Sequence, residues 1–282
     1  MERILVGTIG YYGRAIIRKY RSISSCEIVG IIDNDETIWG SKFWDIEVLN
    51  PNALKNLNFD SILIGGRDFN HIKQGLLNNF SFDESKVRRI SKSDVKPCQK
   101  SLTMRNNEIK KILFFIKKIL VSNNIFYTLD FSGLLSLKRG QLMSEFSDVE
   151  IAILEKDIKK LLSLMSNMPK KFDIRLTYVT KKNSLYKKGD LIGIDIFSEK
   201  YNSYFLEPAI VSITVKKIRG KSAFYLSEHG KIFKYKSSHF IAAKTIKYDH
   251  LALNVPLNSS KYLYQLYGSD WKIQSEFWSG LK

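Results

Sequence analysis

The chain has 282 residues, 44% of them hydrophobic and 12% aromatic, so it is long enough for two packed domains and is neither a disordered nor a fibrous protein. Its two cysteines, Cys26 and Cys98, exclude a disulfide framework and a cysteine-based zinc site. No stretch approaches the ~18 consecutive apolar residues of a membrane-spanning helix, and the chain opens on a short strand rather than a signal peptide, so we expect a cytoplasmic location.

The net charge of +17 comes from 45 basic and 28 acidic side chains, and it is unevenly placed. Residues 1–100 carry a net charge of +3, and the rest of the chain carries +14. Such a field attracts nucleotides, phosphorylated glycans, nucleic acid or acidic lipid surfaces. Because AT-biased coding also enriches lysine, the charge alone does not choose among these partners.

Strand and helix patterns alternate over residues 1–95. Because this alternation is typical of βαβ units, we expect a Rossmann-like α/β domain with a parallel sheet and helices on both faces. Short apolar runs predict strands at 4–6, 27–32, 61–64 and 87–90, and helical spacing predicts helices at 14–20 and 70–79.

A glycine turn follows the first predicted strand, with Gly7, Gly10 and Gly13 at intervals of three. Glycines let backbone N–H groups at a helix start approach a phosphate, and Asp33, after the second strand, could accept hydrogen bonds from a ribose. The alternative is that the glycines serve only strand-to-helix packing. The run from Val29 to Asp35 resembles the domain that precedes PglD-type sugar acetyltransferases, which implies that residues 1–95 bind a nucleotide or nucleotide-sugar.

Residues 91–106 lack a sustained period and contain Pro97, so we place the domain junction there and expect a second domain at 105–282. A helix is expected from about residue 107, and over 109–121 its lysines alternate with apolar side chains. This pattern suits a helix docked on the core, or one lying on an anionic bilayer at the inner face of the membrane. An α+β domain is indicated by strands at 125–129, 149–154, 174–179, 191–197 and 209–217, and helices at 133–140, 156–165 and near the C-terminus.

Two carboxylates, Asp148 and Glu150, are spaced i, i+2 at the start of a predicted strand. On a strand these positions share a face, so together they could hold a divalent cation. Asp195 lies between Ile194 and Ile196 on another predicted strand, where an acid is costly to bury unless it is paired or metal-bound. The alternative is that Asp148 and Glu150 are simply exposed acids on an edge strand.

The segment 127–153, with Ser132-Gly133-Leu134-Leu135 before the acids, resembles the LicD/fukutin-related family, whose members carry a Gly-x-Leu-Leu-Gly-x-x-Arg turn followed by an acidic run. Gly193-Ile194-Asp195-Ile196-Phe197 is similar to a strand of that family. Asn254-Val255-Pro256, Tyr262-Leu263 and Tyr267-Gly268-Ser269-Asp270-Trp271 are similar to its closing pattern. The four matches occur in the family's order over about residues 110–275.

This resemblance implies a nucleotidyltransferase-like second domain in which Asp148, Glu150 and Asp195 chelate Mg²⁺ or Mn²⁺. It also implies phosphate binding by Ser132, Gly133, Lys138 and Arg139, because arginine suits bidentate phosphate contacts. The implied activity moves phosphocholine or an alditol phosphate from a CDP-linked donor to a hydroxyl of a glycan or nucleotide-sugar acceptor, in polysaccharide biosynthesis. The sequence departs from the pattern by Ser136 in place of the second glycine and by Glu150 in place of an aspartate.

Two further classes remain open. The net charge of +14 in the second domain is also typical of a nucleotidyltransferase that acts on or binds nucleic acid. Such binding would weaken steeply as the salt concentration rises. We expect a glycan acceptor rather than nucleic acid. The degenerate acidic motif suits a catalytically silent assembly protein that binds nucleotide-sugars without metal-dependent turnover.

Overall fold

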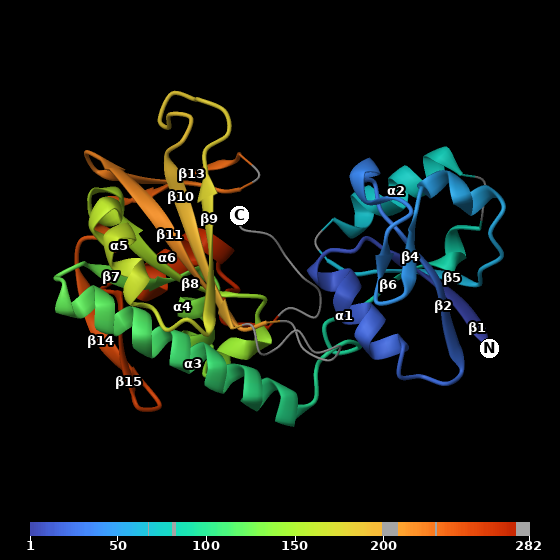
Figure 1. Cartoon of the computed structure of the whole chain (residues 1–282), viewed down its shortest axis with the longest axis horizontal. Coiled ribbons are helices and arrows are strands. Elements are labelled where there is room, and N and C mark those ends of the chain that lie inside the picture. The colour runs from blue at the N-terminus through green and yellow to red at the C-terminus, as the bar shows by residue number, and fades with distance from the viewer. Residues whose placement is uncertain (67, 81–82, 199–207, 229, 275–282) are drawn as a thin grey trace. The chain divides into compact units, whose positions relative to one another are not determined.

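The computed structural model describes residues 1–66, 68–80, 83–198, 208–228 and 230–274. These residues divide into two compact units, Met1–Pro97 and Cys98–Ile273, which are described separately (Figure 1). Both are mixed α/β structures. Within the described ranges, no helix has the length and apolar character needed to cross a bilayer.

The first unit is built on a six-stranded sheet with strand order β3-β4-β2-β1-β5-β6. All neighbouring strands are parallel except the β3–β4 hairpin. Its elements are β1 (Glu2–Gly7), α1 (Tyr11–Tyr20), β2 (Cys26–Ile32), β3 (Lys42–Phe43), β4 (Ile46–Leu49), β5 (Ser61–Ile64), α2 (Phe69–Asn79) and β6 (Val87–Arg89).

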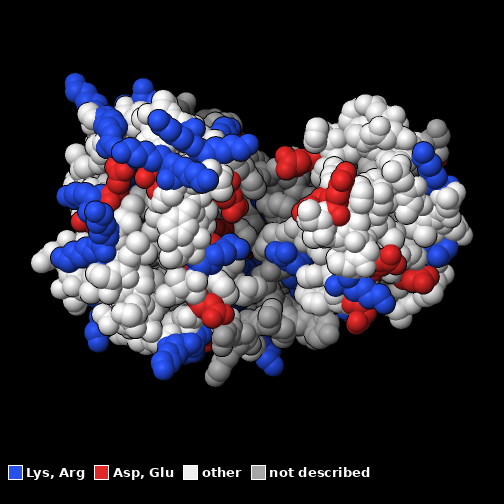
Figure 2. All heavy atoms as spheres, turned by 45° about the horizontal axis from the view of Figure 1, so that its top comes forward, with Lys and Arg blue, Asp and Glu red and all other residues white. Residues whose placement is uncertain are grey.

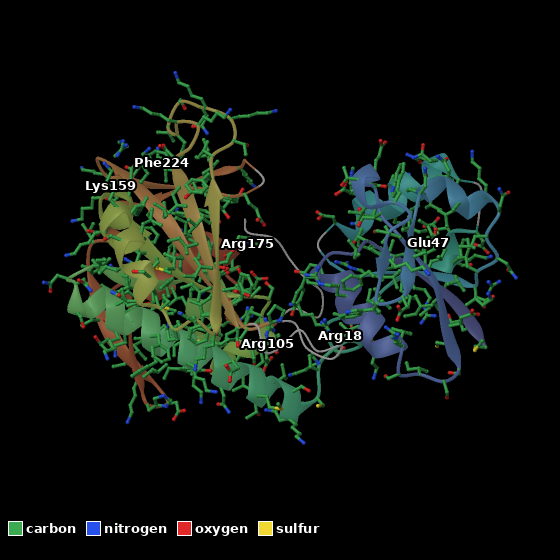
Figure 3. The ribbon with its side chains drawn as sticks, viewed as in Figure 1. Arg18, Glu47, Arg105, Lys159, Arg175 and Phe224 are labelled. Atoms are coloured by element: carbon green, nitrogen blue, oxygen red, sulfur yellow. The ribbon has the colours of Figure 1, made fainter. Side chains whose placement is uncertain are left out.

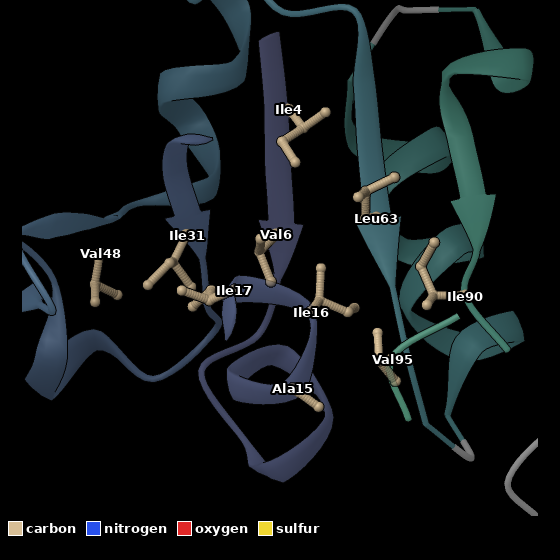
Figure 4. Close-up of a cluster of buried hydrophobic side chains, with 10 residues drawn as sticks. All are labelled: Ile4, Val6, Ala15, Ile16, Ile17, Ile31, Val48, Leu63, Ile90 and Val95. Atoms are coloured by element: carbon tan, nitrogen blue, oxygen red, sulfur yellow. The ribbon is translucent and has the colours of Figure 1, made fainter. Parts of the chain in front are cut away.

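Successive residues of the central strand β1 belong to two separate hydrophobic cores, because side chains alternate across a strand. Ile4 and Val6 pack with Ile16 and Ile17 of α1 on one face (Figure 4). On the other face, Leu5 packs in a cluster that includes Leu76 of α2 and Ile62 and Ile64 of β5. The expectation of a parallel sheet covered on both faces is therefore confirmed.

The β3–β4 hairpin was not expected from the sequence. Its two-residue loop, Trp44 and Asp45, has positive φ at both positions, which a primed hairpin turn requires and which glycine or asparagine usually supplies. Arg21 donates a hydrogen bond to the carbonyl of Trp44 at 2.8 Å and lies 3.6 Å from the carboxylate of Asp45. These contacts hold the turn despite its unfavourable side chains.

The second unit is built on a seven-stranded mixed sheet in which β11 pairs with β10, β8 and β12, and β7 pairs with β8. A separate hairpin, β14–β15, completes its strands. Its elements are α3 (Gln99–Ser122), β7 (Tyr127–Asp130), α4 (Phe131–Arg139), β8 (Val149–Leu154), α5 (Ile158–Leu164), β9 (Phe172–Tyr178), β10 (Leu191–Ser198), β11 (Ile210–Arg219), β12 (Ser222–Leu226), β13 (Ile232–Lys236), β14 (Ala243–Tyr248), β15 (Leu251–Pro256) and α6 (Ser259–Tyr267).

The long helix α3 covers one face of this sheet. It contacts β10 and β11, and its ring of Phe115 meets Phe172 of β9 at 5.8 Å between centroids. The opposite face is approached by α4, whose Gly133 lies against the backbone of Glu150. The acids predicted as a site therefore lie on the α4 face of the sheet.

The helix α3 begins earlier than predicted, at Gln99, directly after Pro97 and Cys98. The expected irregular junction over 91–106 is wrong in its second half, because Leu102, Arg105 and Asn106 are buried on the core side of the helix. The strands β12 to β15 were also not predicted; in β13 and β14, lysines interrupt the apolar pattern.

Candidate active site

Five side chains form one row across five neighbouring strands of the second unit. Asp195 of β10 is opposite Ser212 of β11, which is opposite Glu150 of β8. Asp130 of β7 is opposite Glu150, and Arg175 of β9 is opposite Asp195. Residues that pair across strands point to the same face, so the row gathers three carboxylates, a hydroxyl and a guanidinium on the α4 face.

Asp148, immediately before β8, joins this row through Ser212. The Ser212 Oγ lies 2.7 Å from Oδ1 of Asp195 and 3.2 Å from Oδ2 of Asp148. Asp148 Oδ1 also accepts a hydrogen bond from Ser147 Oγ at 2.6 Å. Two of the acids predicted from the sequence thus converge on one hydroxyl, although they are 47 residues apart in the chain.

Glu150 faces the start of α4 instead. Its Oε2 accepts hydrogen bonds from the backbone N–H of Ser132, at 3.0 Å, and from the hydroxyl of Ser132. Burial of this carboxyl raises its pKa well above the ordinary 4.5, and the neighbouring negative charge of Asp148 raises it further. Glu150 is therefore harder to ionise than a solvated glutamate.

Arg175 is the basic member of the row. Its Nε and Nη2 donate hydrogen bonds to Oδ2 of Asp195 at 3.0 and 2.7 Å, and this contact raises the pKa of the guanidinium. The side chain lies on β9, toward the centre of the view in Figure 3, and most of it is exposed. Arg175 therefore offsets part of the negative charge of the site from its solvent side.

Two residues outside the row fix the backbone around the acids. A Cβ at Gly133 would lie 2.9 Å from the carbonyl oxygen of Glu150, so glycine permits the close approach of α4 to β8. The buried Arg105 of α3 donates hydrogen bonds to the carbonyls of Ser144, at 3.0 Å, and of Ser147 (Figure 3). The loop that leads into Asp148 is thereby tied to the long helix.

Behind the acids lies a buried ion pair. Lys216 of β11 is fully buried, with Nζ 2.6 Å from Oδ2 of Asp130, and burial lowers the pKa of the lysine. Asp130 also accepts hydrogen bonds from Thr214, at 2.9 Å, and Tyr262, at 2.5 Å. The Nζ of Lys216 lies within 6 Å of the ring centroids of Phe131, Tyr225, Tyr235 and Phe240.

Arg139 and Lys138 were also predicted to bind phosphate, and the structure places them elsewhere. Arg139 donates hydrogen bonds to the backbone carbonyls of Trp271 and Ile273, both at 2.7 Å, and so fastens the segment after α6. Lys138 lies in the last turn of α4, at the other end of the helix from Ser132 and Gly133. Lys138 and Arg139 were expected to bind one phosphate together with Ser132 and Gly133. The structure does not bring these four residues together at one point.

In the first unit, the glycine turn is shaped by packing. A Cβ at Gly13 would lie 1.7 Å from the carbonyl oxygen of Thr8, and one at Gly7 would lie 2.6 Å from Ile64. Gly10 caps α1, and a Cβ added there would come no closer than 3.9 Å to any neighbour. Asp33 accepts hydrogen bonds from the backbone N–H groups of Ile9, at 2.9 Å, and Asp35, at 3.0 Å. These contacts account for Gly7, Gly13 and Asp33 without a ligand, and nucleotide binding stays a prediction.

The donor set around Asp148 and Asp195 is made of hard oxygen atoms, which suits Mg²⁺ or Mn²⁺. In the described ranges, however, no three Asp, Glu, His or Cys side chains are grouped closely enough to hold a metal ion. The observed pair is compatible with Mg²⁺ binding, since proteins often hold this ion through one or two carboxylates plus water and substrate phosphates. The residues thus fit a two-carboxylate site better than the predicted three-carboxylate site.

Comparison with known proteins gives one family match and several distant structural likenesses. The model of the family described as C2185-like, N-terminal, matches residues 1–88. No curated protein matches the chain. The lincosamide antibiotic adenylyltransferase LnuA, in its lincomycin-bound structure, is 13% identical, with 55% of this chain and 84% of that chain covered at a TM-score of 0.36.

Two oxidoreductase structures cover most of the chain at lower scores. The putative oxidoreductase yvaA from Bacillus subtilis is 12% identical over 98% of this chain and 91% of its own, with a TM-score of 0.25. Scyllo-inositol dehydrogenase from Lactobacillus casei is 10% identical over 91% and 82%, with a TM-score of 0.24. Likenesses at these scores establish neither a shared fold nor a shared activity.

The family match corrects the resemblances drawn from the sequence. The assignment of the first part to PglD-type domains is wrong, because the family model that matches there is the C2185-like one. The resemblance of the second part to the LicD/fukutin-related family is also wrong, since the family model that matches this chain is not a LicD one. Short motifs in the right order can recur because strand ends and helix caps draw on the same few residue types.

Proposed function

We propose that the second unit has a nucleotidyltransferase-like fold and is a metal-dependent transferase, which moves a phosphorus-containing group from a nucleoside-phosphate donor to a hydroxyl. The observation that carries this proposal is the convergence of Asp148 and Asp195 on the single hydroxyl of Ser212. Asp195 lies on β10 and Asp148 immediately before β8, and the pairing of both strands with β11 sets their positions.

Ser212 has too few protons to satisfy both neighbouring carboxylates, and this favours a bound cation at the site. A serine hydroxyl has one proton to donate, yet two carboxylate oxygens lie within reach of it. A site with more acceptors than protons is stabilised by a bound cation.

Mg²⁺ or Mn²⁺, held by Asp148 and Asp195, would supply charge neutralisation for the donor phosphates. Arg175 would then bind a phosphate oxygen of the donor, because its guanidinium borders Asp195 and is open to solvent. Glu150 and Ser132 would hold the start of α4 in register with β8.

The transfer itself needs little covalent chemistry from the protein. The acceptor oxygen would bond to phosphorus as the bond from phosphorus to the leaving nucleotide or pyrophosphate breaks, and the carboxylate of Asp148 or Asp195 would take the hydroxyl proton. Positioning and electrostatic stabilisation would account for most of the rate enhancement.

The proposed function specifies a nucleoside-phosphate donor and not the group that it carries. A CDP-linked donor and a glycan or nucleotide-sugar acceptor remain candidates to test, but no described residue distinguishes choline from ribitol or glycerol. Of the aromatic residues that could cage a choline, Tyr201, Tyr204 and Phe205 lie outside the described residues. The ring of Tyr225 contacts the chain's own Lys216, with Nζ 4.3 Å from its centroid.

The test is turnover by the purified full chain with Mg²⁺ and each of CTP, ATP, CDP-choline, CDP-ribitol and CDP-glycerol, scored for release of pyrophosphate or CMP that depends on an added hydroxyl acceptor. Turnover with one donor, lost in Asp148→Asn and Asp195→Asn but kept in Asp157→Asn, would support the assignment. Full turnover in the Asp148→Asn variant would refute it.

A further inference from the structure

The solvent side of α3 carries an exposed stripe in which apolar and basic side chains alternate. Met104, Phe114 and Val121 are exposed to 42%, 47% and 54%, and the exposed Lys111 and Lys118 lie between them. Because the spacing is three, four or seven residues, all five positions lie along one side of the helix. The stripe runs from Met104 to Val121 of this 24-residue helix, which corresponds to ~26 Å along the helix axis.

The apolar surface continues from α3 onto the edge strand β9. The ring of Phe115 meets that of Phe172 at 5.8 Å, and beyond Phe172 the side chains of Ile174 and Leu176 point to the same face, each 37% exposed. Lys171 lies over both rings, with Nζ 5.6 Å from the centroid of Phe115 and 5.1 Å from that of Phe172.

The charge on this surface is predominantly positive. The stripe itself contains no acid, and Lys117, Lys118 and Lys171 surround its apolar centre. Two acids beside it are Glu108, 2.5 Å from Lys111, and Asp249, 2.9 Å from Lys110. Asp173 of β9 points to the opposite face of its strand. Glu108 and Asp249 each already face a lysine, so the field beyond the surface is that of the remaining lysines and matches an anionic partner. Figure 2, which turns the top of Figure 1 forward, shows that basic side chains are spread over that other side of the unit as well.

We propose that this surface, α3 with the adjoining part of β9, docks on an anionic lipid bilayer. Apolar side chains interleaved with lysines on one side of a long helix suit the boundary between headgroups and acyl chains, where rings insert and lysines contact phosphate. A protein-binding groove would instead concentrate its apolar residues in a core depleted of lysine. The surface lies on the α3 face of the sheet, opposite the row of acids, so docking leaves the candidate active site accessible.

The test is co-sedimentation of the full chain with vesicles of phosphatidylcholine alone and of phosphatidylcholine mixed with phosphatidylglycerol. We expect binding to the mixed vesicles and little to the neutral ones, with the affinity falling as salt rises. Phe114→Ser with Val121→Ser should weaken binding roughly tenfold, since both side chains would leave the apolar region of the bilayer. Ile241→Ser with Leu257→Ser, a matched loss of exposed apolar residues elsewhere in the unit, should not.

Charge reversal separates this surface from the general basic character of the chain. Lys117→Glu with Lys118→Glu should weaken binding at least roughly tenfold, whereas Lys181→Glu with Lys182→Glu, in the exposed loop between β9 and β10, should change it less than about threefold. Equal losses in both pairs, or no binding of the wild type to anionic vesicles, would overturn the proposal. Capture of a protein through α3 without vesicle binding would also overturn it. Circular dichroism of each variant checks that it is folded.

Discussion

Arg175 donates two hydrogen bonds to one oxygen of Asp195, at 3.0 and 2.7 Å, while the other oxygen of Asp195 accepts from Ser212. In the proposed function the same carboxylate, which is bound by arginine through Oδ2, would also bind a divalent cation. The guanidinium and the cation therefore compete for Asp195 in the free protein, and the competition is open to measurement.

Arg175→Gln should bind Mg²⁺ more tightly than the wild type, because the competing charge is removed. The gain should be modest, up to about fivefold, since exposed ion pairs contribute ~1 kcal/mol or less. Isothermal titration with MgCl₂ measures it. The matched control is Arg219→Gln, which removes a similarly exposed arginine that lies 3.3 Å from Glu155. If Arg175→Gln bound Mg²⁺ less tightly than Arg219→Gln did, the two cations would not be competing.

Glu150→Gln should stabilise the metal-free protein, and the gain should grow with pH. Below pH 4.5 the carboxyl is protonated in both the folded and the unfolded chain, so its burial carries no ionisation penalty. As pH rises above 4.5, the unfolded chain ionises first and the folded protein loses stability until the raised pKa is passed. Thermal unfolding across pH measures the difference, and a gain that is constant with pH would contradict the raised pKa.

Lys216→Met should destabilise the second unit by about 3–5 kcal/mol, because it leaves the carboxylate of Asp130 buried without its counter-charge. Adding Asp130→Asn should recover part of that loss, since the amide is neutral and still accepts hydrogen bonds. Urea unfolding of the two single variants and the double variant gives the coupling energy. Additive losses in the double variant would show that the pair does not act as a unit.

Gly13→Ala should destabilise the first unit by roughly 1–3 kcal/mol or more, because its Cβ would overlap the carbonyl oxygen of Thr8. Gly10→Ala should cost less than about 1 kcal/mol, since nothing lies closer than ordinary contact to the added methyl group. Unfolding monitored by the tryptophans of this unit distinguishes the variants. Equal effects would mean that the turn is not fixed by packing at Gly13.

The strands with regular apolar patterns could be predicted from the sequence. β8 was placed at its observed bounds. Asp148 and Glu150 were singled out because positions i and i+2 of a strand share a face, and Asp195 because an acid on an apolar strand is costly to bury. Their partners could not be found in this way, because Ser212 and Arg175 are ordinary residues for a strand, and only cross-strand register brings them together. The hydrogen bonds of Glu150 to Ser132, which turn it from the other acids, depend on the approach of α4.

Arg139 is the opposite case, because it was predicted as a site residue but makes structural contacts instead. The resemblance of its segment to the LicD/fukutin-related turn implied a phosphate contact, but its N–H groups donate to two backbone carbonyls that are 132 and 134 residues away in the chain. Lys216 was missed because a lysine in a strand is ordinarily exposed. Its complete burial depends on Asp130 and on rings from four other positions, which no local pattern indicates.

The central claim is that Asp148 and Asp195 together hold one divalent cation beside Ser212. The most direct measurement is anomalous diffraction from crystals of the full chain grown with MnCl₂ and a non-hydrolysable CTP analogue. The account predicts a manganese peak coordinated by both carboxylates, with no peak in the Asp195→Asn variant. Well-ordered Asp148 and Asp195 with manganese bound elsewhere, or not bound, would contradict it.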